Sequence, residues 1–565
     1  MRRIALTLAL VAALGGALRV LVRRPPGAVL YRGGPILTLD GTGQVAEALG
    51  TEGDRIAAVG SEPEFLSWAR DRGARVVELR GRTLVPGFID AHGHFPGTGL
   101  FALFVDLQSP PGGPVEDLAG LVARLGARAR KTPEGQWVIG LGYDDTLLAE
   151  GRHPTRYDLD RASSRHPVAA VHVSGHLAAV NSAALAELGI GAATPDPEGG
   201  RIHRDPARGE PDGVLEETAM LGVSERLRPG LLGSLRMLRR AVRDSLAAGI
   251  TTAQSGLAPA GLIRALGLAS RLGLLPLRVV VWPDADAADA MLAGEIELES
   301  PGPAWLRVGA IKLVADGSIQ GYTAWLRDPY HVPPSGRPGW RGYPRMDPQE
   351  LRERVLRYHA TGLQVAVHGN GDAAIDIILE AIEEAQSRHP RPDPRHIVVH
   401  AQTARPDQLD TMARLGVIPS FFVLHTFYWG DRHRDIFLGP ERARRISPAA
   451  GAGLRGIPFT LHADAPVVPM EPLRIVDAAV NRTTRTGVVL GPEERIAPLA
   501  ALRAITADAA RQHFEEHEKG SLEPGKLADL VILSRSPLED RTRLLEIEVE
   551  ETIVGGRSVY RRGSP

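Results

Sequence analysis

The 565-residue chain is 43% hydrophobic, which is enough for a large buried core and for more than one domain. Its net charge is −1 and it has no basic stripe with interleaved aromatic residues, so we exclude a nucleic-acid-binding protein. Cysteine is absent, which excludes disulfides, thiol nucleophiles and thiolate metal ligands. Nitrogen and oxygen atoms must therefore hold any metal that the protein binds.

Residues 1–24 predict a membrane anchor or an export signal. Two arginines precede an uncharged run, Ile4 to Leu18, which is shorter than the roughly 20 residues of a membrane span and suits a signal-peptide core. Extended to Val22, the run could cross a membrane once, with Arg19 reaching toward the headgroups. We favour a single uncleaved anchor over a cleaved export signal, and a helix packed on the protein is the third alternative. The first two place the protein at the membrane or in the envelope or periplasm, rather than in the cytoplasm.

Both ends of the remaining chain have the texture of short strands separated by turns. Near the N-terminus such segments cover residues 28–40, 47–60 and 74–88. Near the C-terminus they cover residues 526–537 and 549–563. We predict a small β unit at each end.

The middle of the chain alternates β-rich segments with helix-like segments rich in arginine, alanine and leucine. One strand precedes His92, and seven more are predicted at residues 166–175, 249–256, 306–317, 363–372, 396–402, 416–422 and 457–467. Eight strands alternating with helices predict an α/β fold, a (β/α)₈ barrel of the TIM type.

Polar side chains fall in or at the ends of several of these strands. His92 and His94 are two residues apart, a spacing that puts both rings on one side of an extended strand. The complete set is His92, His94, Lys312, His368, His400 and Asp464. Each residue alone has an ordinary structural explanation, but active sites of such barrels lie at the carboxyl ends of the strands. Together the six predict a metal site.

Lysine is rare in this chain. Only Lys131, Lys312, Lys519 and Lys526 are lysines, and the other basic residues are arginine. A chain that uses arginine almost everywhere is expected to keep some lysines for a chemical reason.

With these residues in place, the sequence resembles the amidohydrolase superfamily, and more narrowly the YtcJ-like members of amidohydrolase family 3, which include N-substituted formamide deformylases. The resemblance starts from "VPGFIDAHGHF", the lysine, the two single histidines and the final aspartate. It is supported by "WVIGLGYDD", "GHLAAVNSAAL", "VADGSIQGYTAWL", "VHGNGDAAID", "LHTFYWGDRH", "ALRAITADAAR" and "GSLEPGKLADLVIL".

The resemblance implies a hydrolase barrel over residues 84–513, with an insertion at about 95–165. It also implies a β-sandwich built from residues 27–83 and 514–565. His92, His94 and Asp464 would hold one divalent ion, and His368 and His400 the other, with Lys312 bridging them as a carbamate formed from carbon dioxide. Two ions about 3.5–4 Å apart lower the pKa of a bridging water and polarise a carbonyl. Zinc is the expected metal, because the ligands are imidazoles and carboxylates without sulfur.

The resemblance also implies catalytic roles for Asp464, Lys312 and His400, with Asp464 moving the proton from the attacking water to the departing nitrogen. Substrate contacts are expected from the segments at the mouth of the barrel. The candidates are Tyr143, His176, Tyr322, Trp325, His425 and Trp429. Each of these residues except His176 has an alternative role as a packing residue. His176 is equally compatible with supporting the site and with a purely structural role.

The leading hypothesis is hydrolysis of a non-peptide carbon–nitrogen bond, of the amide, N-acyl or N-formyl type, in a small-molecule substrate. A second hypothesis uses the same metals on an ester, lactone or phosphoester. A third is an inactive, envelope-anchored binding or regulatory protein. The sequence is compatible with an oligomer and does not name the substrate.

Overall fold

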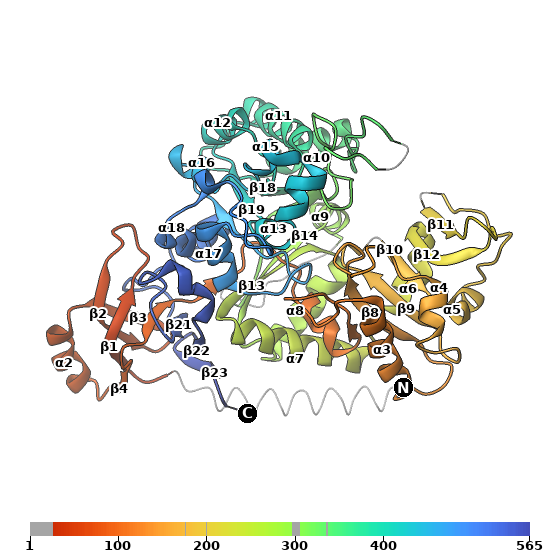
Figure 1. Cartoon of the computed structure of the whole chain (residues 1–565). Coiled ribbons are helices and arrows are strands. Elements are labelled where there is room, and N and C mark those ends of the chain that lie inside the picture. The colour runs from red at the N-terminus through yellow and green to blue at the C-terminus, as the bar shows by residue number, and fades with distance from the viewer. Residues whose placement is uncertain (1–25, 176, 199, 296–304, 335–336, 565) are drawn as a thin grey trace. The chain divides into compact units, whose positions relative to one another are not determined.

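The computed structural model describes residues 26–175, 177–198, 200–295, 305–334 and 337–564 (Figure 1). The chain folds into two compact units. The first comprises the chain up to Phe95, Val242–Ala465 and Met470 onward, and the second comprises Pro96–Ala241 with Pro466–Pro469. Predictions for residues 1–24 and for His176 lie outside the described residues. Within the described residues, no helix is long and apolar enough to cross a membrane.

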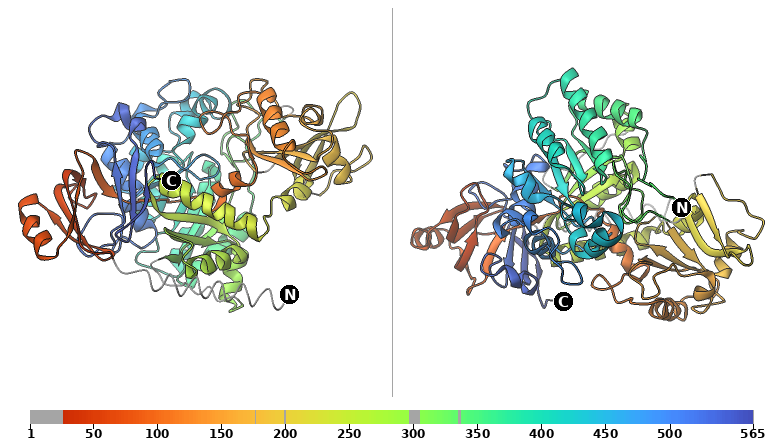
Figure 2. Two further views of the ribbon diagram at one scale, coloured as in Figure 1. Left: turned by 90° about the horizontal axis from the view of Figure 1, so that it is seen from below. Right: turned by 45° about the horizontal axis from the view of Figure 1, so that its top comes forward.

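The two ends of the chain form one sheet in the first unit. Its hydrogen-bonded order is β23-β22-β21-β5-β1-β2-β3, and β4 pairs with β1. The strands are β1 (Val29–Leu37), β2 (Val45–Glu52), β3 (Arg55–Gly60), β4 (Arg75–Glu78), β5 (Thr83–Pro86), β21 (Leu530–Leu533), β22 (Val549–Val554) and β23 (Arg557–Arg561). The antiparallel pairing of β21 with β5 joins the two ends, and the views of Figures 1 and 2 agree in showing the red and blue strands side by side.

Apolar side chains fix this sheet. Leu84, Leu530 and Ile532 are fully buried in one core cluster. On another face, Leu30 packs with Phe65 of helix α2 (Glu62–Asp71). Burial of such side chains is the main favourable contribution to folding.

Two parallel sheets form the centre of the first unit. One has the order β15-β14-β13-β6, and the other the order β16-β17-β18-β19-β20. The strands are β6 (Phe88–Ile89), β13 (Ile250–Ala258), β14 (Arg278–Pro283), β15 (Leu306–Val308), β16 (Ile311–Val314), β17 (Val365–Gly369), β18 (Ile397–His400), β19 (Ile418–Phe421) and β20 (Thr460–Leu461). The strands are buried almost throughout, as expected of parallel sheets covered on both faces.

One core cluster contains residues from both parallel sheets, including Val280 and Trp282 of β14 and Val399 of β18. Helices follow the strands along the chain, which gives a mixed α/β fold. Those of the first unit are α8 (Ala260–Arg271), α9 (Ala285–Leu292), α10 (Pro348–Ala360), α11 (Asp372–Arg388), α12 (Pro406–Leu415), α13 (His425–Tyr428), α14 (Gly430–Arg432), α15 (Gly439–Ala443), α16 (Ala449–Leu454), α17 (Pro472–Asn481), α18 (Pro498–Ala504) and α19 (Ala507–Gln512).

The second unit has its own six-stranded sheet, of order β11-β12-β10-β9-β8-β7. The strands are β7 (Val105–Asp106), β8 (Val138–Tyr143), β9 (Val168–His172), β10 (Leu177–Val180), β11 (Gly200–Arg204) and β12 (Pro211–Glu217). Its helices are α3 (Leu118–Ala129), α4 (Arg156–Asp160), α5 (Ser182–Glu187) and α6 (Leu221–Arg226), and α7 (Leu231–Ala247) leads back into the first unit.

The structure corrects one predicted strand. Residues 166–175 were expected to form one of the eight barrel strands, but they contain β9, which pairs with β8 and β10 in the second unit. The strand Arg278–Pro283 (β14) was not predicted, and it lies between β13 and β15 in one of the two parallel sheets of the first unit. Both are short buried apolar runs, and the period of a pattern does not tell which sheet such a run joins. The second unit also extends to Ala241, well beyond residue 165.

Candidate metal centre

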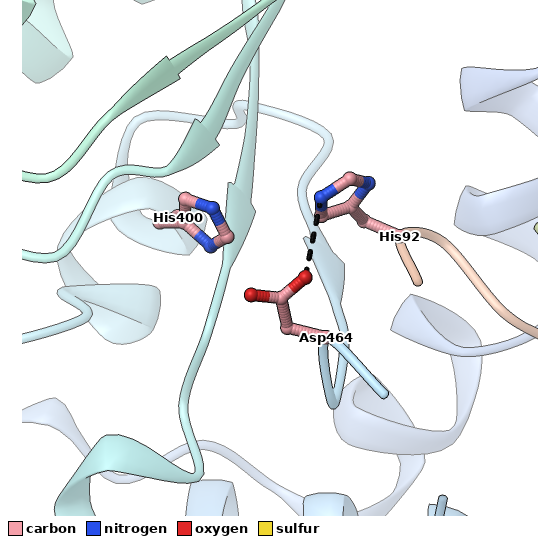
Figure 3. Close-up of side chains that lie close together, drawn as sticks. All are labelled: His92, His400 and Asp464. Carbon is pink, nitrogen blue, oxygen red and sulfur yellow. Dashed lines mark ion pairs between the residues drawn. The ribbon is translucent and has the colours of Figure 1, made fainter. Parts of the chain in front are cut away.

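The six polar residues predicted at the strand ends come together in the first unit. His92 and His94 follow β6, Lys312 lies in β16 and His368 in β17. His400 ends β18, and Asp464 follows β20. Figure 3 shows His92, His400 and Asp464 facing one another, and atoms of these three side chains that could ligate a metal lie within 4.8 Å of one another.

Short distances connect the group. Oδ1 of Asp464 lies 3.2 Å from Nε2 of His94 and 3.4 Å from Nε2 of His92. Nζ of Lys312 lies 3.2 Å from the same Nε2 of His92. The ring centroids of His92 and His400 are 5.5 Å apart, and those of His368 and His400 are 4.4 Å apart. The side chain of His94 is 36% exposed, so the group is reached by solvent from this side.

Burial keeps the imidazoles of His92, His368 and His400 neutral. It lowers the pKa of His92 and His400 well below the ordinary value, and neighbouring charges add to the effect. Burial, reinforced by the charge of Lys312, lowers the pKa of His368 to about 3. A neutral imidazole offers a lone pair, which is the form that binds a metal.

The pKa values of Lys312 and Asp464 are both lowered, which is the direction that metal binding needs. Burial lowers the pKa of Lys312 from 10.5 to about 7, so a large part of this amine is neutral at physiological pH. Burial raises the pKa of Asp464, but the neighbouring His94, His462 and Lys312 outweigh it and hold this pKa below its ordinary value. Asp464 is therefore an anion at neutral pH.

These residues fit a divalent ion. Oδ1 of Asp464 is buried and faces two imidazole nitrogens, yet within the described residues it accepts no hydrogen bond. A carboxylate and neutral imidazoles converging on one point form the donor set that zinc and related first-row metals prefer.

The backbone is strained at the same place. His400, Ala401 and Asp464 have φ values of 74°, 46° and 55°, in the left-handed region that non-glycine residues rarely adopt. Such strain costs about 1–3 kcal/mol per residue and clusters at functional sites. It turns the chain sharply at the ends of two strands, directly at the convergent side chains.

The structure adds residues that the sequence analysis missed. Nε2 of His462 lies 3.0 Å from Nδ1 of His400, and Trp282 stacks on His92 with ring centroids 5.3 Å apart. Asp316, fully buried, accepts hydrogen bonds from the backbone N–H groups of Asn370, Gly371 and Trp325. His462 carries a signal: it precedes Asp464 by two residues, the spacing of His92 and His94.

Four of the predicted substrate residues, Tyr322, Trp325, His425 and Trp429, have packed or hydrogen-bonded surroundings. Tyr322 packs against Tyr330 and Phe437, and the backbone N–H of Trp325 donates to Asp316. His425 and Trp429 are each 2% exposed, with ring centroids 4.4 Å apart. Nδ1 of His425 lies 2.9 Å from Nε2 of His433. These contacts show packing around all four side chains, and their role toward a substrate stays a prediction.

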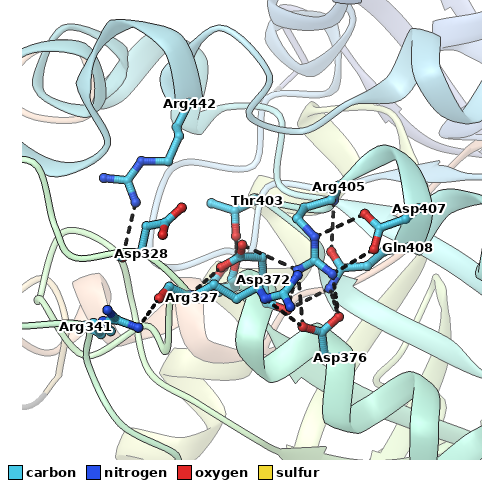
Figure 4. Close-up of polar contacts among 12 residues, drawn as sticks. Arg327, Asp328, Arg341, Asp372, Asp376, Thr403, Arg405, Asp407, Gln408 and Arg442 are labelled. Atoms are coloured by element: carbon cyan, nitrogen blue, oxygen red, sulfur yellow. Dashed lines mark hydrogen bonds and ion pairs between the residues drawn. The ribbon is translucent and has the colours of Figure 1, made fainter.

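Arginines hold the loop that follows Trp325. Arg341 donates to the carbonyl of Arg327, and the N–H of Arg327 donates to Asp372 at the start of α11. Arg405 binds Asp376 and Asp407 at 2.7 and 2.9 Å (Figure 4). The loop is thereby tied to the carboxyl-end side of the central strands, where α11 and α12 begin.

Tyr143 lies in the second unit, where its hydroxyl is 3.0 Å from Nδ1 of His153. Beside it, Asp145 lies 3.1 Å from Nε2 of His172. The backbone N–H of Ser174 donates to Nδ1 of His172, so Nε2 is the ring nitrogen that can donate to Asp145. Asp145 and His172, together with Asp144, form a second group whose potential ligand atoms lie within 4.8 Å of one another.

Comparison with known proteins agrees with this geometry. The pattern of the amidohydrolase family matches residues 75–560. The chain is 31% identical over 539 residues to an N-substituted formamide deformylase of Arthrobacter pascens, covering 93% of this chain and 97% of the relative. It is 29% identical to the putative amidohydrolase YtcJ of Bacillus subtilis, covering 94% and 99%.

Among solved structures, an uncharacterized metal-dependent hydrolase of Pyrococcus furiosus superposes with a TM-score of 0.71 at 27% identity, over 91% of this chain and 100% of that one. The family pattern covers most of the chain, and its hydrolase relatives match nearly end to end. The protein belongs to the amidohydrolase family and is a metal-dependent hydrolase.

Proposed function

We propose that the protein hydrolyses a non-peptide carbon–nitrogen bond of the amide, N-acyl or N-formyl type in a small molecule. The observation that carries the proposal is the convergence of four imidazoles, one aspartate and one buried lysine in a member of this family. The relative from Arthrobacter pascens is an N-substituted formamide deformylase, which favours carbon–nitrogen over ester or phosphoester substrates.

We propose the ligands as follows. His92, His94 and Asp464 would hold one zinc ion, His368 and His400 would hold the other, and Lys312, as a carbamate formed from carbon dioxide, would supply an anionic ligand between them. When bound, the ions supply a water of near-neutral pKa and polarise the carbonyl of the substrate. The lowered pKa of Lys312 supports the bridge, because a neutral amine reacts with carbon dioxide and an ammonium does not.

Asp464 moves the proton in this proposal. It is an anion at neutral pH and lies at the centre of the group, so it accepts the proton of the attacking water. The protonated carboxyl then donates to the nitrogen that leaves as the carbon–nitrogen bond breaks. Nε2 of His94 and Nε2 of His92 are near Oδ1 of Asp464, at 3.2 and 3.4 Å.

We also propose that the two parallel sheets form one eight-stranded barrel in which β15 and β16 are halves of a single strand. Only Gly309 and Ala310 separate these halves. Support for closure comes from the backbone N–H of Asp464, beyond β20, which donates to the carbonyl of His92, beyond β6, at 3.3 Å. A barrel explains why side chains from strands far apart in the sequence meet at one mouth.

The test combines metal analysis with a substrate screen of N-formyl, N-acyl and lactone compounds on the full-length protein. We expect two zinc ions per chain and turnover of amides that Asp464→Asn lowers by at least ~10²-fold. Turnover of lactones alone would favour the ester hypothesis. Full metal content with no turnover of any compound would favour the inactive binding protein, and a metal content near zero after growth with zinc would contradict the binuclear centre.

A further inference from the structure

Next to the candidate metal centre, a row of buried polar side chains connects the backbone carbonyl of Ala91 to His400. It runs from the backbone of Ala91 through Gln512, Thr460, Ser420 and His462. All four side chains are fully buried. Buried polar groups need hydrogen-bond partners, so the direction of each bond in this row is constrained.

Gln512 sets the direction at one end. The nitrogen of its side-chain amide lies 2.8 Å from the carbonyl oxygen of Ala91. A carbonyl oxygen only accepts, so the amide nitrogen must face it, and Oε1 must face Thr460. Because Oε1 is itself only an acceptor, the hydroxyl of Thr460, at 2.6 Å, donates to it.

The single hydroxyl proton of Thr460 is then used. Ser420 lies 2.8 Å from the same oxygen, and the geometry of this contact is the better one for donation by Thr460. Because the closer Oε1 of Gln512, at 2.6 Å, can only accept and holds the Thr460 proton, Ser420 is the group that has a proton left for the second bond. The two residues are direct partners in the pairing of β19 with β20, which holds them at this distance. With its proton given to Thr460, the Ser420 oxygen acts as an acceptor toward Nδ1 of His462, at 3.0 Å.

The tautomer of His462 determines which ring nitrogen of His400 carries the hydrogen. A neutral imidazole carries one proton, and the bond to Ser420 places it on Nδ1. Nε2 of His462 is then an acceptor and takes the proton of Nδ1 of His400, 3.0 Å away. Nδ1 of His400 thus carries a hydrogen, and Nε2 of His400 keeps its lone pair.

We propose that Gln512, Thr460, Ser420 and His462 are positioning residues that fix the tautomer of His400, so that its Nε2 is presented to the metal centre as a ligand. The direction of the hydrogen bonds follows from the chemistry of the six groups, from the carbonyl of Ala91 to His400, and does not depend on a metal. The statement that His400 is a ligand rests on the proposed function. Partners of this kind tune metal affinity, and their loss typically costs about 10–100-fold.

The first experiment observes the protons. Neutron diffraction from deuterated crystals of the full-length protein, treated with a chelator, locates deuterium on each ring nitrogen. We expect deuterium on Nδ1 of His462 and on Nδ1 of His400. Deuterium on Nε2 of His400 would overturn the proposal, whether or not the protein hydrolyses amides.

The second experiment measures zinc affinity by competition with a coloured chelator. Thr460→Val removes the only hydroxyl that joins Gln512 to Ser420, and we expect a 10–100-fold loss of affinity. Thr460→Ser keeps the hydroxyl and should restore the affinity to near wild type. The matched control is Thr506→Val, because Thr506 is equally buried but donates to the carbonyl of Leu502 within a helix turn.

The results separate three cases. Weak binding by Thr460→Val, with rescue by Thr460→Ser and no effect of Thr506→Val, supports the proposal. Equal affinity in all variants, in protein that melts like wild type, overturns it. If Thr460→Val does not fold, neutron diffraction of the wild type still decides which nitrogen of His400 carries deuterium. If the wild type binds no zinc, the proposed function fails, but the same neutron experiment still tests the tautomer.

Discussion

Replacement of Lys312 by arginine tests the centre of the proposed chemistry. Lys312 is 3% exposed, and its Nζ lies 3.2 Å from Nε2 of His92. An ammonium at this position would repel two divalent cations, whereas a carbamate would attract both. Arginine keeps its charge at any accessible pH and cannot form a carbamate. Lys312→Arg should therefore lose both bridging and metal.

The structure gives the size of the effect. With a pKa of about 7, about half of the Lys312 amine is neutral at pH 7, roughly a thousandfold more than for an ordinary lysine. Metal ions stabilise a hydrolytic transition state by several kcal/mol, and each 1.36 kcal/mol is a factor of ten in rate. Loss of the metals should therefore lower kcat/KM by at least ~10³-fold.

The assay compares zinc content, turnover and melting temperature of Lys312→Arg with those of Lys131→Arg, a change at an exposed lysine that should be silent. A short carboxylic acid added to Lys312→Ala should restore part of the activity by replacing the carbamate. Two bound metals and full turnover in Lys312→Arg would refute the reasoning.

Three further predictions follow from the same structure. Asp464→Asn should lower kcat by at least ~10²-fold with a nearly unchanged melting temperature, and unchanged turnover would make Asp464 only a turn residue. Asp316→Asn offers one acceptor oxygen to three backbone N–H groups and should lower the unfolding free energy by about 1–3 kcal/mol in urea titrations, where an unchanged value would argue against a structural role. Burial lowers the pKa of His396 and His513 to about 3, so between pH 6.5 and 3 the unfolded chain binds more protons than the folded chain does. The melting temperature of protein treated with a chelator should therefore fall as the pH falls through this window. A flat profile would contradict that last expectation.

The sequence was a good guide to the residues at the strand ends and a poor one to what lies behind them. His92, His94 and Asp464 stand next to apolar runs and sharp turns, which are local signals. Gln512 and Ser420 have no such signal, because their importance comes from contacts with distant parts of the chain. Gln512 lies 421 residues after Ala91, whose carbonyl accepts from its amide nitrogen, and Ser420 lies 42 residues before His462. Only the folded chain brings these groups together. 

The predicted strand at residues 166–175 failed for a related reason. The run Val168–His172 and the run Arg278–Pro283 are both short and buried, and composition does not distinguish them. Their partners decide the outcome, since β9 pairs with β8 and β10, and β14 pairs with β13 and β15. The contact between the rings of His425 and Trp429 could not be predicted from the sequence either, and a role of these residues toward a substrate stays a prediction.

The scarcity of lysine is a weaker argument than the position of Lys312. Lys519 is also buried, 2.9 Å from Glu515, and Lys526 lies 2.6 Å from Glu523. These two lysines have carboxylate partners, so their ammonium groups are explained by ion pairs without any special chemistry. Lys312 instead faces a neutral imidazole, and burial lowers its pKa to about 7. The chemical reason for a lysine at this site therefore comes from its neighbours, and composition alone would have pointed equally to Lys519.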